Sequence, residues 1–185
     1  MDVAALAAVP GLELSIVSVE AAGAGRWPMP YRLHVVDGRI VDGGEDPDLA
    51  AHVTATLARG IALLGPPPEE VLVAPPWPVF LQSIVDDLDW GMERIHERPG
   101  YAVLNGARVV LTLQSPAGTV LGKEEAAALA LERFPREHHP LLEQAVAERL
   151  GAAVEWDPEA LRRYRTFVVG AAVRRRPGRK VAGLP

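Results

Sequence analysis

The chain of 185 residues contains no cysteine, which excludes disulfide bonds, thiolate nucleophiles and thiolate metal sites. Lysine is scarce as well, since Lys123 and Lys180 are the only lysines among 19 basic residues. No run is long or apolar enough to span a bilayer. The first residues also lack the basic cluster that begins a secretory signal. We therefore expect a cytoplasmic protein with no membrane partner.

The remaining composition is that of an ordinary globular protein, with 49% hydrophobic and 23% charged residues. The net charge of −5 disfavours nucleic acid as a partner. The same charge suits a small cationic ligand. Composition gives no information about the oligomeric state.

The first third of the chain alternates like a sheet protein. Its patterns predict strands over residues 12–19, 31–36, 39–41 and 61–64, and a helix over 46–59. The Asp37-Gly38 pair predicts a hairpin turn. The acidic residues of the segment 42–46 are expected in a turn. An amino-terminal helix over 2–9 is also predicted.

Prolines at 66–68 and 75–78 indicate a linker, and the pattern beyond it is helical. We predict helices over 78–97, from Tyr101 onward, from Lys123 onward, over 136–150 and from Asp157 onward. The expected domains are an α/β domain over 1–68 and a helical bundle over 76–176, followed by a flexible tail at 177–185. The fold class is therefore α+β.

The segment 101–113 is almost wholly apolar, yet Tyr101, Asn105, Arg108 and Thr112 recur at helical spacing and share one face. Arg108 keeps its proton and needs an anionic partner, which is either a ligand phosphate or a structural carboxylate. Lys123 opposes the dipole of the helix that it begins. Both cations are therefore candidates for contact with an anion.

The predicted helix over 78–97 carries a row of carboxylates at spacings of three, four and four. Its members are Asp86, Asp89, Glu93 and Glu97. Two interpretations stay open: a solvated helix surface, or an acidic wall that pairs with the ammonium groups of a polycationic ligand.

Several motifs resemble one family. These are Asp46-Pro-Asp-Leu-Ala-Ala-His52, Gly60-Ile-Ala-Leu-Leu-Gly-Pro66, Tyr101-x-Val-Leu-Asn-x-x-Arg108, Gly122-Lys-Glu-Glu-Ala126, Ala130-Leu-Glu-Arg-Phe-Pro135 and His139-Pro-Leu-Leu142. Together, from about residue 12 to about residue 151, they resemble the streptomycin/spectinomycin adenylyltransferases. The resemblance implies a partial nucleotidyltransferase-type mixed sheet followed by a C-terminal helical bundle.

The resemblance also implies a reaction, the transfer of AMP from ATP to a hydroxyl of an aminocyclitol antibiotic. Glu13 would be the catalytic base, while Arg108 and Lys123 would bind the nucleotide. The substrate-binding residues implied are Trp27, Asp86, Asp89, Glu93, Glu97, Tyr101 and Asn105. Trp27 has a second interpretation, as a residue of the core.

The complete family enzyme uses ATP and Mg²⁺, held by a Gly-Ser loop and an Asp-x-Asp strand. We find no such loop and strand, and no other metal site, so we expect this chain alone to be inactive or nearly so. The resemblance also implies an acidic residue just ahead of Tyr101, where this chain has Arg98-Pro99-Gly100, and an aromatic residue near the end of the fourth helix, where it has Arg149. The alternative function is a non-catalytic module or pseudoenzyme that binds a small molecule.

Overall fold

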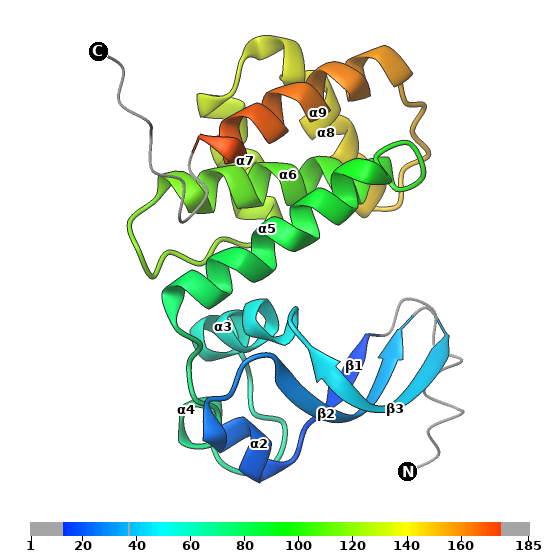
Figure 1. Cartoon of the computed structure of the whole chain (residues 1–185). Coiled ribbons are helices and arrows are strands. Elements are labelled where there is room, and N and C mark those ends of the chain that lie inside the picture. The colour runs from blue at the N-terminus through cyan, green and yellow to red at the C-terminus, as the bar shows by residue number, and fades with distance from the viewer. Residues whose placement is uncertain (1–12, 37, 175–185) are drawn as a thin grey trace. The chain divides into compact units, whose positions relative to one another are not determined.

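The computed structural model describes residues 13–36 and 38–174 (Figure 1). The predicted helix over 2–9 and the predicted tail at 177–185 lie outside these residues. The chain divides into two compact units, Met1–Ser83 and Ile84–Pro185. The division falls inside helix α5 (Trp77–Glu93), and the expected bounds of 1–68 and 76–176 stay a prediction.

Unit 1 contains three strands, β1 (Leu14–Ile16), β2 (Met29–Val36) and β3 (Arg39–Asp46), in the order β1-β2-β3. Figure 1 shows them as one small sheet. Leu14 pairs with Val35 and Met29 with Asp46, antiparallel in both cases. The α+β class is confirmed. The pairing among the described strands is antiparallel throughout, where a mixed sheet was expected.

Short helices complete unit 1: α2 (Val19–Ala24), α3 (Leu49–Arg59) and α4 (Pro68–Val71). The strand predicted over 12–19 is shorter, because the Ser18 side chain accepts the N–H of Ala21 and begins α2. Met29 of β2 and Leu49 and Val53 of α3 form the buried centre of the unit. The hairpin and the helix ending at Arg59 are confirmed.

Two predictions for unit 1 are wrong. Ile61, Leu63 and Leu64 were expected in a buried strand, but they are exposed by 83%, 95% and 96% and lie in no strand. An apolar run becomes a strand only where a neighbouring strand can accept its backbone bonds. The segment 42–46, expected in a turn, continues β3 because Met29 and Pro30 extend the partner strand opposite it.

Unit 2 is helical. After α5 come α6 (Pro99–Gln114), α7 (Lys123–Arg133), the short 3₁₀ helix η1 (Arg136–His138), α8 (His139–Arg149) and α9 (Pro158–Val173). α6 packs against α7, α8 and α9, and its residues are buried on nearly every side. Within the described residues, no helix combines the length and apolar character needed to cross a membrane.

Small residues let the helices approach α6 closely. A Cβ added to Gly106 would lie 3.2 Å from Val168 and 3.3 Å from both Met92 and Tyr164. The Tyr164 hydroxyl, fully buried, donates to the Val103 carbonyl at 2.7 Å. The face of α9 that carries Leu161, Tyr164, Val168 and Ala172 is buried. α6 is therefore a rigid base for the side chains that it carries.

His138 gives unit 2 a titratable core group. The side chain is 2% exposed and packs between the rings of Tyr164 and Phe167. Burial lowers its pKa below the usual 6.5; Arg163 and His139 act in the same direction, and Glu137 opposes them. Folding therefore disfavours the imidazolium form.

We expect the free energy of unfolding to fall as the pH drops below about 6.5, where the unfolded chain takes up the proton first. The slope contributed by His138 is at most about 1.4 kcal/mol per pH unit. Urea unfolding between pH 7.5 and 5.5 measures it. His138→Phe keeps the ring packing and should remove this contribution, and equal slopes in the two proteins would contradict the assignment.

Candidate functional site

The polar face predicted on α6 exists, and it turns inward. Asn105 is fully buried and Thr112 is 3% exposed, while Tyr101 and Arg108 are partly buried. Arg108 Nη2 donates to Asn105 Oδ1 at 2.6 Å. A buried guanidinium and amide have to be satisfied within the protein. Their partners therefore define the site.

Asp87 of α5 is the carboxylate that meets this face. Its Oδ1 accepts the Tyr101 hydroxyl at 2.6 Å, and its Oδ2 lies 3.3 Å from Arg108 Nη2. The exposed fractions of the side chains are 16% for Asp87 and 26% for Arg108. The anionic partner that sequence left open as phosphate or carboxylate is, in this structure, a carboxylate.

Asp87 was not predicted as a site residue, because it does not belong to the row of carboxylates that share a helical spacing. The residues around Asp87 do indicate that it faces the interior. Ile84 lies three residues before it, Leu88 directly follows it and Gly91 lies four residues after it, and all three are buried. A Cβ added to Gly91 would lie 3.6 Å from the Tyr101 ring. An aspartate among such residues faces the interior.

Lys123 reaches the same tyrosine from α7. Its Nζ lies 4.2 Å from the centroid of the Tyr101 ring, a cation–π geometry. Tyr101 thus connects the two predicted nucleotide-binding cations: its hydroxyl bonds the carboxylate beside Arg108, and its ring carries Lys123. Trp90 packs edge-on against the same ring, with centroids 5.9 Å apart.

Two polar atoms of the site have no hydrogen-bond partner among the described residues, although both are buried. They are Arg108 Nε and Asn105 Nδ2. Buried donors without acceptors are uncommon and costly in native proteins. They show that the Asp87 carboxylate only partly meets the donor capacity of this face.

The four carboxylates predicted to form an acidic wall do not share one helical face. Asp86 and Glu93 are exposed and Asp89 is half-buried. Glu97 lies in a turn, since α5 ends at Glu93, and so does not continue the helical face. Glu93 pairs with Arg94 at 3.6 Å. Binding of a polycation by these residues stays a prediction.

Basic residues share this end of α5. The guanidinium carbons of Arg94 and Arg98 lie 4.7 and 5.6 Å from the centroid of the Trp90 ring. The family resemblance led us to expect an acidic residue in this region, but Arg98 places a positive charge beside Trp90. Arg149, the other departure, forms an ion pair with Glu124.

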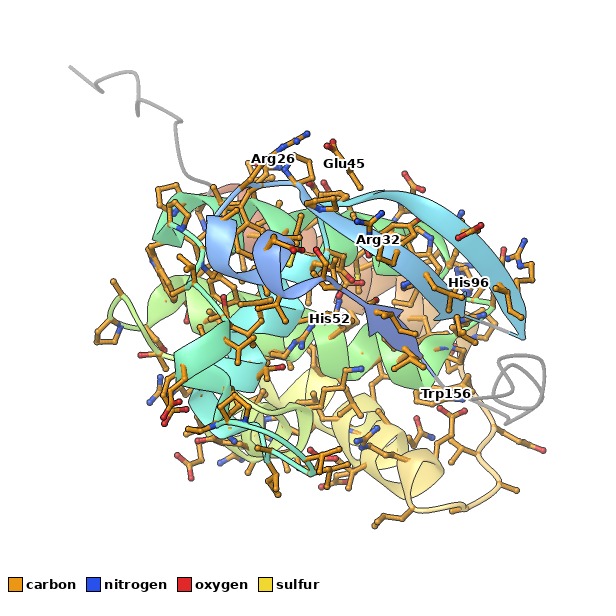
Figure 2. The ribbon with its side chains drawn as sticks, turned by 90° about the horizontal axis from the view of Figure 1, so that it is seen from below. Arg26, Arg32, Glu45, His52, His96 and Trp156 are labelled. Carbon is orange, nitrogen blue, oxygen red and sulfur yellow. The ribbon has the colours of Figure 1, made fainter. Side chains whose placement is uncertain are left out.

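Glu13 lies in unit 1, directly before β1 and not within it. Its Oε1 is 3.7 Å from His52 Nε2, and that nitrogen lies 3.4 Å from Asp48 Oδ2. The hydrogen bond to Asp48 raises the pKa of His52 above 6.5, with Glu13 contributing a smaller electrostatic effect. Figure 2 labels His52 on α3, with Arg26 and Glu45 forming a separate ion pair.

Trp27 packs against the cluster of Met29, Leu49 and Val53. This position matches the core interpretation of the residue. The indole Nε1 is buried and has no hydrogen-bond partner among the described residues. A substrate contact by Trp27 therefore stays a prediction.

One group of three possible metal ligands occurs within the described residues: Glu13, Asp48 and His52. Mg²⁺ prefers oxygen ligands. Here one donor is an imidazole that its neighbours hold toward the protonated state. The group does not fit the ion that ATP chemistry uses, and we derive no step through a metal.

The fold and the α5–α7 site define a class: a small α+β protein whose helical half presents inward-facing cations. Residues 70–171 match the family model described as "Aminoglycoside adenylyltransferase, C-terminal domain". This match covers more than half of the chain. The chain therefore belongs to the aminoglycoside adenylyltransferase family.

Individual relatives agree. The chain is 31% identical over 121 residues to the spectinomycin 9-adenylyltransferases of Staphylococcus aureus strains Mu50 and N315, covering 65% of this chain. It spans only 45% of the length of these relatives. A crystal structure of the spectinomycin adenyltransferase from Enterococcus faecialis with ATP and spectinomycin superposes with a TM-score of 0.76 at 19% identity. That match covers 87% of this chain and 68% of that one, and supports the fold.

We expect the Asp87–Arg108 pair to be coupled in stability. A double-mutant cycle of Asp87→Asn and Arg108→Gln, followed by urea unfolding, should give a coupling energy of about 1–2 kcal/mol, because both groups are largely removed from water. The exposed Glu93–Arg94 pair is the control, with an expected coupling below about 0.5 kcal/mol. Equal coupling energies would show that the Asp87–Arg108 pair stabilises the fold no more than an exposed pair does.

The His52 contacts predict a titration. Proton NMR of the His52 ring should give a pKa above 6.5, because Asp48 and Glu13 stabilise the imidazolium. Asp48→Asn should lower this pKa more than Glu13→Gln, since the Asp48 hydrogen bond is the larger cause. The reverse order would indicate that Glu13 is the main partner of the ring.

Proposed function

We propose that this chain takes part in the transfer of AMP from ATP to a hydroxyl of an aminocyclitol, with Arg108 and Lys123 contacting the phosphates. The observation that supports it best is the convergence of both cations on Tyr101. They come from separate helices, α6 and α7, of the segment that matches the family model. An arginine with a purely structural role would not need a second cation such as Lys123 beside it.

The chemistry of the donors fits a phosphate. A guanidinium offers paired N–H groups to phosphate oxygens, and an ammonium offers a mobile point charge. Arg108 Nε is buried and donates to no group among the described residues. Arg108 and Lys123 bring two positive charges to Tyr101, and Asp87 brings one negative charge.

Glu13 is the proposed proton acceptor for the attacking hydroxyl. Its side chain is half exposed, so a substrate hydroxyl has access to the carboxylate, as general base catalysis requires. A protonated His52 competes for Oε1 of this carboxylate. We expect the base to act when His52 is neutral.

The proposed acceptor contacts are the carboxylates Asp86, Asp89, Glu93 and Glu97, together with Tyr101, Asn105 and Trp27. Carboxylates suit an aminocyclitol because desolvated ammonium groups need paired anions. Asn105 is deeply buried, so we propose that it acts by holding Arg108.

Calorimetric titration of the chain with ATP and with spectinomycin tests the proposal. We expect Arg108→Gln to weaken ATP binding by about tenfold, the loss of roughly one charge-assisted contact. Spectinomycin binding should stay within about twofold, which is less than half a kcal/mol. Arg133→Gln is the control, because it removes the same positive charge from an exposed part of α7.

Equal weakening of both ligands would contradict a phosphate role for Arg108. Binding of spectinomycin without any binding of ATP would favour the alternative function, a non-catalytic module that binds a small molecule. If neither ligand binds, family membership and fold remain but the proposed function fails.

A further inference from the structure

Asp87 occupies the position next to Arg108 that the proposed function gives to a phosphate. Its carboxylate is held at both oxygens, by Tyr101 at Oδ1 and by Arg108 at Oδ2. An anionic ligand that approaches Arg108 therefore meets a guanidinium whose charge is already partly neutralised. Asp87 competes with the ligand for the same cation.

The two contacts of Asp87 differ in quality. The bond from the Tyr101 hydroxyl is short, at 2.6 Å, whereas the contact with Arg108 is long, at 3.3 Å. Charge-assisted N–H···O bonds of full strength are typically about 2.7–2.9 Å long. The Asp87–Arg108 contact is therefore the weaker of the two and the easier one to exchange.

Each partner also keeps a hydrogen bond when this contact breaks. Asp87 stays bound to the Tyr101 hydroxyl, and Arg108 stays bound to Asn105 Oδ1 at 2.6 Å. Neither charge is then left without a partner while the ligand enters, which is the event that makes breaking a buried ion pair expensive. The local network is thus built for an exchange of anions.

Resting on the function proposed above, we propose that Asp87 is an affinity-determining residue of the phosphate site, an exchangeable counter-ion that holds Arg108 until a polyphosphate replaces it. Tyr101 lowers the free energy needed for this exchange. It retains the displaced carboxylate by its hydroxyl while its ring keeps Lys123 beside the incoming anion.

The experiment uses inorganic pyrophosphate, titrated calorimetrically into the full chain at low ionic strength to limit screening. Asp87→Asn keeps the shape of the side chain and removes its charge. We expect this variant to bind pyrophosphate about tenfold more tightly than the unaltered chain, a change of about 1.4 kcal/mol. A merely structural role for Asp87 would give weaker binding or no change, and either result overturns the proposal.

The charge-matched control is Glu132→Gln, which changes the net charge by the same amount. Glu132 lies nine residues after Lys123 on α7, about 13 Å along the helix axis at 1.5 Å per residue. An equal gain in this control would reveal a general charge effect and overturn the proposal. Arg108→Gln added to Asp87→Asn should abolish the gain, and a gain that survives would also overturn it.

Tyr101→Phe tests the exchange from the other side. The ring that carries Lys123 remains, but Asp87 loses the hydroxyl that would retain it after displacement. We expect pyrophosphate to bind severalfold more weakly, because the carboxylate then depends on Arg108 alone. Tighter binding in this variant would contradict the exchange.

Thermal unfolding with and without pyrophosphate keeps the test decisive if Asp87→Asn lowers stability. The ligand should stabilise Asp87→Asn more than the unaltered chain, since ligand stabilisation follows affinity; an equal or smaller effect overturns the proposal. The outcome separates from that of the proposed function. A gain in pyrophosphate affinity in Asp87→Asn, with no ATP or spectinomycin binding by the unaltered chain, supports the counter-ion and rejects adenylyl transfer.

Discussion

The helical unit depends on how one permanent positive charge is held beside a buried helix. α6 is enclosed by its neighbours, and Arg108 can remain at its edge only if its charge and hydrogen bonds are met nearby. Asp87 and Asn105 meet part of that need. The position of α5 against α6 is thereby tied to an electrostatic contact as well as to apolar packing.

Small residues make this electrostatic contact geometrically possible. Gly91 leaves α5 without a side chain beside the Tyr101 ring, and Gly106 lets α9 and Met92 approach α6. Lys123 is unfavourable at the start of α7 because it opposes the helix dipole, but Glu124 and Glu125 offset it in the same turn. The ring of Tyr101 adds a cation–π contact. Residues of α5, α6, α7 and α9 thus all contribute to the packing around the site.

Sequence predicted the helices of unit 2 and the inward face of α6 well, because a 3.6-residue period survives burial and needs no knowledge of the partner helix. It did not identify Asp87, since spacing shows which residues share a face but not which face meets a neighbour. The strand prediction for residues 61–64 was wrong for a related reason. Its apolarity is local, whereas a strand requires a partner from elsewhere in the chain. The role assigned to Glu13 came from family resemblance alone, whereas the acidic row was one of two interpretations of the carboxylate spacing, and both roles remain proposals.

The surroundings of Arg108 determine how selectively it can bind anions. A cation that faced solvent would bind anions with little selectivity, because water and salt screen it, and a cation fully neutralised by a close carboxylate would bind none. Arg108 lies between these limits: its carboxylate is near but not at full bonding distance, and its Nε is buried without an acceptor. We expect such an arrangement to favour a ligand with several oxygens, because one oxygen can replace Asp87 while another accepts from Arg108 Nε. Polyphosphates have that property, and chloride does not.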